Sequence, residues 1–171
     1  HIDILVNAVG GSTIIASPGA KVDELSFEDW QKLIDFNLNA TYLWCNNVVP
    51  LMRQAGYGKI VNLSSIAGRG LAGASSSAYA AAKGGIIAFT KHLSIELGPS
   101  GINVNAIAPG AFSTEMMDGM LERMGDIAQH FPRKRIGDPA QMDSTLLYFL
   151  SPASEFVTGT YIKIDDAQGG R

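Results

Sequence analysis

Tyr79 and Lys83 are the side chains of this sequence whose types and spacing best suit chemistry. They stand four residues apart in Tyr79-Ala80-Ala81-Ala82-Lys83, and in a helix this spacing places both on one face. A phenol normally keeps its proton up to a pKa of about 10, but a neighbouring ammonium and the positive end of a helix both favour the phenolate. The pair could therefore transfer a proton near neutral pH. An ordinary surface pair has the same spacing, so a site needs further residues.

Short apolar runs alternate with stretches of helical periodicity, which predicts an α/β fold with a parallel sheet. The expected strands are Ile2–Val6, Lys59–Leu63, Ile102–Ala108 and Tyr161–Ile164. Cap and periodicity signals predict four main helices. They cover about Phe27–Asn37 after the N-cap Ser26, Thr41–Gln54 before Gly56, the stretch from beyond Ser75-Ser76-Ser77 to Gly98-Pro99, and about Pro139–Leu150.

Small and polar residues follow three of the expected strands. The clusters are Asn7-Ala8-Val9-Gly10-Gly11, Ser64-Ser65 and Pro109-Gly110. Each cluster alone could be plain turn chemistry. In open parallel sheets, however, ligands bind outside the carboxyl ends of the strands. Together the clusters therefore predict a ligand site at that edge of the sheet.

Composition excludes several classes of protein. The formal net charge of −3 argues against a basic nucleic-acid binder, and 46% apolar with 17% charged residues suits a buried core. No apolar run approaches the roughly 18 residues of a membrane span, so we expect a soluble protein. The single cysteine, Cys45, cannot form an internal disulfide and favours a reducing compartment such as the cytoplasm. No Cys or His spacing resembles a metal site.

Asn37, Ser65, Tyr79 and Lys83, in this order and in their local contexts, resemble the catalytic set of the short-chain dehydrogenases/reductases. The matching segments are Phe36-Asn37-Leu38-Asn39, Ile60–Ser65, Tyr79–Gly85, Asn103–Gly110 followed by Thr114, and Phe156–Gly159. The resemblance covers essentially the whole chain. It implies an α/β fold with a doubly wound, Rossmann-like parallel sheet, in which residues 1–171 form one partial dinucleotide-binding and catalytic domain, the C-terminal part of the whole.

The resemblance also implies an oxidoreductase that interconverts a secondary alcohol and a ketone with NAD or NADP as cofactor. Tyr79 would be the general acid/base, and Ser65 would hold the substrate oxygen. Lys83 would hold the nicotinamide ribose and lower the phenol pKa, while Asn37 would position a water in a proton relay. The implied cofactor-binding residues are Asn7, Ala8, Gly10, Tyr79, Lys83, Pro109, Gly110, Phe112 and Thr114, with no metal.

The sequence departs from the family pattern in three places. Asn7-Ala8-Val9-Gly10 stands where the family usually has Asn-Asn-Ala-Gly, and Asp165-Asp166-Ala167 stands where a glycine pair would follow the aspartate. The glycine-rich loop that holds the pyrophosphate does not appear, so the choice between NAD and NADP cannot be made from this sequence. We therefore expect the chain to be part of a protein of roughly 250 residues, with Ile2–Val6 open at one side.

Several alternatives stay open. A noncatalytic dinucleotide-binding protein could share the fold, and a sugar-nucleotide epimerase or dehydratase could share the Tyr-x-x-x-Lys pair. The carbonyl or alcohol substrate could be a 3-oxoacyl thioester, a sugar, a steroid or an aryl diol. Residues 111–137 could form a mobile lid or an ordinary surface helix. Small residues between Ala78 and Ala88 favour close helix packing, and we expect a homo-oligomer, a tetramer.

Overall fold

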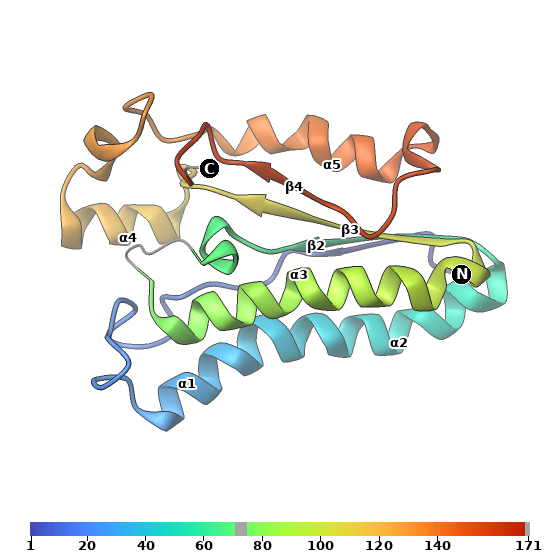
Figure 1. Ribbon diagram of the computed structural model, residues 1–171, viewed down its shortest axis with the longest axis horizontal. Coiled ribbons are helices and arrows are strands. Elements are labelled where there is room, and N and C mark those ends of the chain that lie inside the picture. The colour runs from blue at the N-terminus through green and yellow to red at the C-terminus, as the bar shows by residue number, and fades with distance from the viewer. Residues whose placement is uncertain (71–74, 170–171) are drawn as a thin grey trace.

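A parallel four-stranded sheet forms the centre of the molecule (Figure 1). The computed structural model describes residues 1–70 and 75–169. The strands are β1 (Ile4–Asn7), β2 (Gly58–Leu63), β3 (Ile102–Pro109) and β4 (Tyr161–Ile164), in the order β1-β2-β3-β4. All neighbouring strands are parallel, with Val6 opposite Val61 and Val61 opposite Asn105. The four predicted strands are confirmed, with ends that shift by one or two residues.

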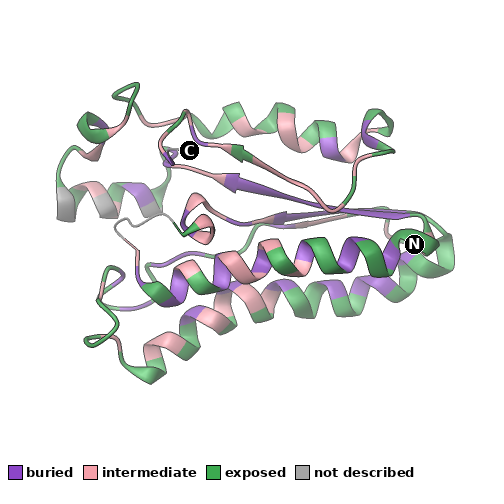
Figure 2. Ribbon diagram, in the orientation of Figure 1, coloured by how far each residue is buried: buried purple, intermediate pink, exposed green. Residues whose placement is uncertain are grey.

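Helices cover both faces of the sheet, as the predicted doubly wound fold requires. Helices α2 (Ala40–Ala55) and α3 (Ser77–Leu97) lie on one face, and α5 (Asp143–Leu150) lies on the other (Figure 1). Successive strand residues point to opposite faces, so Ile60 packs with the α2 and α3 residues while Val61 packs on Phe149 of α5. Both faces of β2 and β3 are consequently buried (Figure 2).

Side-chain caps fix the ends of the main helices where the sequence predicts them. The Ser26 hydroxyl accepts a hydrogen bond from the Asp29 amide at the start of α1 (Phe27–Ile34), and the Ser76 hydroxyl accepts one from the Tyr79 amide at the start of α3. Gly56 ends α2 with a φ of 66°, a left-handed conformation that glycine adopts without strain. These side chains therefore set the lengths of the helices.

A π-helical segment, Asp35–Asn39, joins α1 directly to α2. The prediction of two separate helices, Phe27–Asn37 and Thr41–Gln54, was wrong in this respect. The Asn37 side-chain amide donates to the Leu33 carbonyl, which an α-helix would pair with the backbone amide of residue 37. The Thr41 hydroxyl likewise donates to the Asn37 carbonyl. Side chains thus replace regular backbone bonds here and widen the turn.

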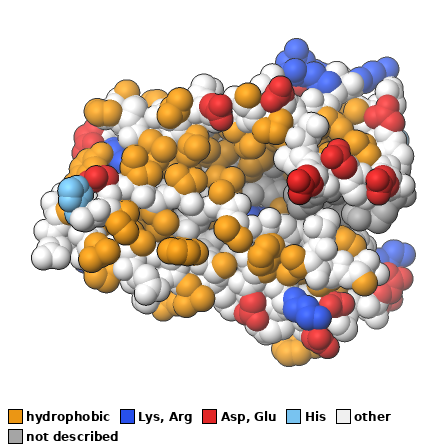
Figure 3. Space-filling view, turned by 180° about the vertical axis from the view of Figure 1, so that it is seen from behind, with side chains coloured by type: hydrophobic (Ala, Val, Ile, Leu, Met, Phe, Trp, Pro, Cys, Tyr) orange, Lys and Arg blue, Asp and Glu red, His pale blue; other side chains and the backbone are white. Residues whose placement is uncertain are grey.

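Strand β1 forms the edge of the sheet and pairs with β2 alone among the described residues. Its Ile4 side chain is 46% exposed. Seen from behind, hydrophobic side chains gather in a broad band across this side of the molecule (Figure 3). A hollow of about 250 Å³ beside β1 is lined partly by Val6, Val9 and Trp44. None of the helices in the described part of the chain is long and apolar enough to span a bilayer.

The segment between β3 and α5 contains a further helix, α4 (Glu115–Met124), and a short 3-10 turn, Ile127–His130. The Thr114 hydroxyl caps α4 by accepting from the Met117 amide at 3.3 Å. A second 3-10 turn, Pro139–Met142, precedes α5. The structure thus gives residues 111–137 a surface helix, and the motion of a lid stays a prediction.

Candidate active site

Gly10 marks the point where the candidate catalytic side chains of separate elements meet. A β-carbon on Gly10 would lie 2.6 Å from the Asn37 Oδ1 atom and 2.8 Å from the Lys83 Nζ atom. Asn37 comes from the π-helical segment and Lys83 from the second turn of α3. The Lys83 ammonium also donates to the Leu63 carbonyl, 2.9 Å away, at the carboxyl end of β2. The site therefore lies at the predicted edge of the sheet.

Tyr79 and Lys83 lie on one face of α3, as their spacing predicts. Both side chains are buried, with exposed fractions of 8% and 4%. The Lys83 Nζ atom lies over the Tyr79 ring, 5.7 Å from its centroid. Burial disfavours a charge on either group, so it lowers the pKa of Lys83 to about 8 and raises the pKa of Tyr79. At pH 7 Lys83 is still mostly protonated, and Tyr79 holds its proton.

The expectation that Lys83 lowers the phenol pKa stays a prediction. The largest effect on Tyr79 is loss of hydration, which raises its pKa, and only a hydrogen bond with Ser65 acts in the opposite direction. The ammonium faces the ring of Tyr79 and its own charge is disfavoured by burial. In this structure the phenol therefore keeps its proton rather than resting as a phenolate.

The two serines after β2 have different surroundings. The Ser64 hydroxyl is buried and donates to the Lys83 carbonyl at 2.7 Å, which ties the strand end to α3. The Ser65 hydroxyl accepts from the Ala67 amide at 3.1 Å and interacts with Tyr79. Ser65 is thus the serine beside the phenol, and Ser64 holds the helix that carries Tyr79 and Lys83.

Asn37 is fully buried and its side chain is held at both ends. Its Oδ1 atom accepts from the Gly11 amide at 2.9 Å, and its Nδ2 atom donates to the carbonyls of Gly11 and Leu33 at 3.0 and 2.9 Å. These bonds fasten the loop after β1 to the π-helical segment. The water relay through Asn37 stays a prediction.

Asn7, the first of the expected cofactor residues, turns its amide into the sheet. Its Nδ2 atom donates to Asn62 Oδ1 at 2.8 Å and to Cys45 Sγ at 3.4 Å. Ala8, which follows it, is exposed. Burial raises the Cys45 pKa to about 11, and the hydrogen bond that Asn7 donates opposes this rise only in part. The Asn7 side chain therefore holds β1 to β2 and α2.

The expected nicotinamide-side residues Pro109, Gly110, Phe112 and Thr114 form a second group at the end of β3. The Gly110 amide donates to the Ile164 carbonyl at 2.9 Å. Phe112 is buried and pairs with Gly137, where a β-carbon would lie 2.7 Å from its ring. This group is held in place by the strand and loop residues that follow it in the sequence.

Two residues that sequence reasoning missed hold these groups together. A β-carbon on Gly68 would lie 2.5 Å from the Lys83 carbonyl carbon, so Gly68 lets the 3-10 turn Ile66–Arg69 pack against α3. Gln168 accepts a hydrogen bond from the Ala111 amide at 2.6 Å. A glycine in a loop and a glutamine near the C-terminus carry no local pattern that could have identified them.

The residues around Gly10 fit a polar group of a cofactor. Because Gly10 has no side chain, the Lys83 ammonium can lie against its backbone, and the Leu63 carbonyl engages one of the three Lys83 donors. Ribose hydroxyls suit the remaining donors. Within residues 1–70 and 75–169 no cluster of three or more His, Cys, Asp or Glu side chains could hold a metal ion.

A parallel sheet with helices on both faces and a polar site at its carboxyl edge defines a doubly wound α/β protein of the Rossmann type. A family model described as enoyl-(acyl carrier protein) reductase matches residues 1–167. The short-chain reductase protein NovJ of Streptomyces niveus is 37% identical over 100% of this chain and 64% of its own length. The chain belongs to the short-chain dehydrogenase/reductase family.

Further relatives are also named as reductases. The 3-oxoacyl-[acyl-carrier-protein] reductase FabG of Chlamydia muridarum is 37% identical over 96% of this chain and 64% of its own. The chain thus spans just under two thirds of the length of these curated relatives. A crystal structure of a 3-oxoacyl-[acyl-carrier protein] reductase from Brucella melitensis matches with a TM-score of 0.90 and 36% identity, over 99% of this chain and 63% of that one.

Two further solved structures are described with cofactors. A 3-oxoacyl-[acyl-carrier protein] reductase from Brucella melitensis with bound NAD has a TM-score of 0.88 and 35% identity, over 99% of this chain and 63% of that chain. ElxO with NADP bound has a TM-score of 0.89 and 27% identity, over 100% of this chain and 68% of that chain. Similar structures therefore bind either dinucleotide.

Proposed function

We propose that the protein is an NAD- or NADP-dependent oxidoreductase that interconverts a secondary alcohol and a ketone. The observation that carries this proposal is the group of Ser65, Tyr79 and Lys83, in which a hydroxyl and a buried ammonium lie beside one buried phenol. When bound, the nicotinamide would supply a hydride to a carbonyl carbon or remove one from a carbinol carbon.

In the reducing direction, Ser65 donates a hydrogen bond to the carbonyl oxygen and Tyr79 gives the oxygen its proton. The carbonyl carbon gains the hydride, the oxygen gains the proton, and an alcohol results. The raised pKa of Tyr79 keeps the proton in place until it is needed. The positive charge of Lys83 then favours the phenolate that remains, and Asn37 positions a water that returns the proton.

The proposed cofactor contacts extend from this group along the edge of the sheet. Lys83 and Tyr79 hold the nicotinamide ribose, and Gly10 allows its close approach. The other residues proposed to line the cofactor are Asn7, Ala8, Pro109, Gly110, Phe112 and Thr114. Asn7 contributes through its backbone, because its side-chain nitrogen is engaged by Asn62 and Cys45.

A 3-oxoacyl thioester is the substrate class to test first, because relatives that cover 96% of this chain are named 3-oxoacyl-acyl-carrier-protein reductases. The test follows consumption of NADH and of NADPH by the full-length protein with an acetoacetyl thioester. Tyr79→Phe should lower kcat by roughly a hundredfold or more, while cofactor binding stays nearly unchanged. Tyr57→Phe, at an exposed tyrosine outside the site, is the control. A Tyr79→Phe variant with wild-type kcat would refute the assignment.

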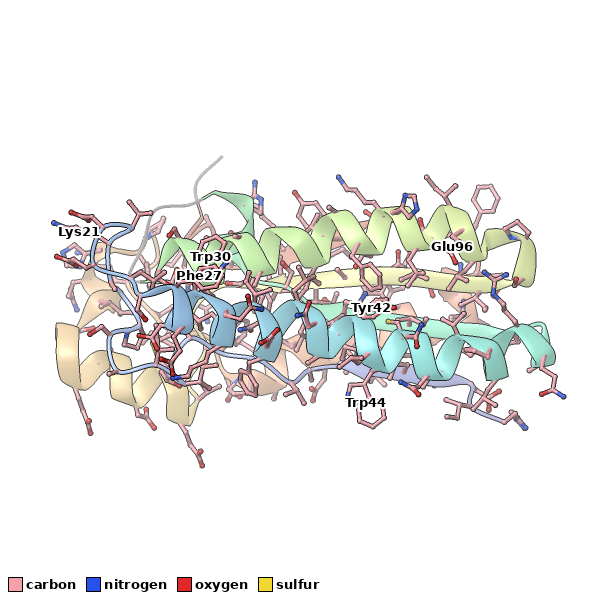
Figure 4. All side chains as sticks on the ribbon, turned by 90° about the horizontal axis from the view of Figure 1, so that it is seen from below. Lys21, Phe27, Trp30, Tyr42, Trp44 and Glu96 are labelled. Carbon is pink, nitrogen blue, oxygen red and sulfur yellow. The ribbon has the colours of Figure 1, made fainter. Side chains whose placement is uncertain are left out.

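We also propose that the full-length protein is a homotetramer that associates through α2 and α3. Gly84 and Gly85 pack inside the chain against Gly68 and Leu38, so the contact surface on α3 rests on its exposed Ala81 and Ala88. Beside them Tyr42 of α2 is 49% exposed and meets Phe89 edge to face. Trp44 points away from α3 on the other side of α2 (Figure 4). Light scattering that found only monomer at micromolar concentration would refute this.

We propose a reducing compartment, the cytoplasm, for the protein. Its single cysteine, Cys45, is free and buried, and burial raises the pKa of the thiol, so the reactive thiolate is disfavoured.

A further inference from the structure

Residues 113–136, which we call the flap, leave and rejoin the body of the protein at one narrow neck. The Gly137 amide donates to the Ala111 carbonyl at 3.0 Å, and the Ser113 amide donates to the Gly137 carbonyl at 2.9 Å. The flap carries α4 and the turn Ile127–His130. Because its two ends are joined here, the neck determines where the whole flap lies relative to the end of β3.

The turn Asp165–Gln168 holds this neck from outside. Gln168 accepts a hydrogen bond from the outgoing side of the neck, at the Ala111 amide. Asp166 binds the returning side through two ion pairs. Its Oδ1 atom lies 2.8 Å from Arg133 Nη1, and its Oδ2 atom lies 2.5 Å from Arg135 Nε. A single turn thus contacts both strands of the neck.

The backbone of this turn is strained at residues other than glycine. Asp166 has a φ of 48° and Ala167 a φ of 65°, a left-handed conformation that disfavours residues with a β-carbon. The Asp165 carboxylate holds the turn closed by accepting from the Ala167 and Gly169 amides, each at 3.2 Å. Glycine would adopt this conformation at position 166 without strain, so what aspartate adds there is its carboxylate.

The Asp166 carboxylate affects the position of the neck more than the free energy of folding. Exposed ion pairs generally contribute little to folding, and the Arg133 and Arg135 side chains are 64% and 42% exposed. Each oxygen of Asp166, however, binds a different arginine, and the two arginines flank Lys134 on the returning side of the neck. This arrangement resists both sliding and rotation of that strand.

We infer that Asp166 is a positioning residue that fixes the flap over the carboxyl end of β3 and thereby affects substrate binding. The inference rests on the proposed oxidoreductase function for its effect on substrate, but not for its effect on the flap. The carboxylate and the two guanidinium groups would hold the neck in one orientation, and Phe112 and Thr114 at the outgoing end would keep their places beside the proposed nicotinamide site.

The test compares Asp166→Asn and Asp166→Gly in the full-length protein, with Asp23→Asn as a control for the loss of one surface carboxylate. Asp166→Gly removes the ion pairs and also the backbone strain at position 166, so a folding defect is not expected. Amide hydrogen exchange of residues 125–137 should be about tenfold faster in both variants and unchanged in the control. Raising the salt concentration should speed this exchange in the wild type and not in the variants, because salt screens exposed ion pairs.

Activity supplies a second and separate measurement. KM for the carbonyl substrate should rise about fivefold in both variants while kcat stays within twofold, a division that general destabilisation would not produce. Unchanged exchange of residues 125–137 in both variants would overturn the inference. Faster exchange with an unchanged KM would overturn the link to substrate. Absence of any oxidoreductase activity in the wild type would refute the proposed function, while the exchange result would still decide the role of Asp166.

Discussion

Replacing Gly10 with alanine should damage the candidate site directly. The new methyl group would lie 2.6 Å from Asn37 Oδ1 and 2.8 Å from Lys83 Nζ. An ordinary contact begins near 3.4 Å, so the Asn37 oxygen is about 0.8 Å too close. The φ of Gly10 is 158°, just inside the region that favours glycine, which adds backbone strain.

Neither neighbour can move without loss. Asn37 is fully buried and its amide makes three hydrogen bonds, two to Gly11 and one to Leu33. Overpacking costs about 1–3 kcal/mol and a lost hydrogen bond about 1 kcal/mol, so the free energy of unfolding should fall by about 2–4 kcal/mol. If Lys83 moves instead, its ammonium loses the Leu63 carbonyl and its place over Tyr79. A displacement near 1 Å can cost roughly a hundredfold in rate.

Urea unfolding followed by circular dichroism measures the first effect, and kcat/KM of the full-length protein measures the second. Gly98→Ala is the matched control, because nothing lies within 4 Å of a β-carbon at Gly98 and its φ of −49° suits alanine. Because Gly98 is helical and precedes Pro99, whose ring disfavours a β-carbon in this conformation, that variant should lose no more than about 1 kcal/mol. A Gly10→Ala variant with the unfolding free energy and kcat/KM of the wild type would refute the close approach of Asn37 and Lys83 at this point.

Three further changes test other parts of the structure. Burial lowers the pKa of Lys83 to about 8, so above this pH the unfolded chain binds a proton that the folded chain has released. The free energy of unfolding should therefore rise by at most about 3 kcal/mol from pH 8 to about 10. Urea unfolding at several pH values should show a flatter profile for Lys83→Met, and a profile with the wild-type slope would contradict the assignment. Asn103→Ala removes a hydrogen-bond partner 2.9 Å from the buried Lys59 ammonium and should lower the free energy of unfolding by about 2–3 kcal/mol. Glu155→Gln changes the exposed partner of the same ammonium and should cost under about 1 kcal/mol. Equal losses of stability in thermal unfolding would refute this ranking. Gly68→Ala places a methyl group against the α3 backbone and should lower the unfolding free energy by about 2–4 kcal/mol, an effect absent if the turn Ile66–Arg69 can move aside.

Local sequence signals predicted the strands, the caps and the meeting of Tyr79 and Lys83 on one helix face. Each of those signals depends on residues a few positions apart, such as Ser76 and the Tyr79 amide. The spacing of residues in the sequence is therefore enough to predict them. The resemblance to a known family then selected Asn37 and Ser65 from many polar residues. The structure brings all four residues to the edge of the sheet, and their catalytic roles stay predictions.

Contacts between distant residues could not be predicted in the same way. The π-helical segment depends on the hydrogen bonds of Asn37 to Gly11, 26 positions away. Helical periodicity describes only neighbouring residues and cannot predict a partner at that distance. The direction of the Tyr79 pKa depends on how much water the folded site excludes, which the Tyr-x-x-x-Lys spacing cannot give. The role of Asp166 depends on Arg133 and Arg135, more than 30 positions earlier.

The π-helical segment Asp35–Asn39 makes the length of this part of the chain a constraint in its own right. A π turn holds one residue more than an α turn, so the five residues of this segment rotate the chain about as far as four α-helical residues at about 100° each. Deleting one residue here would therefore leave α2 close to its present orientation, with Cys45, Val48 and Met52 still facing the core. Asn37, however, would lose its place between Gly11 and Leu33. The extra residue thus serves the candidate site more than the fold, and its deletion should impair activity more than stability.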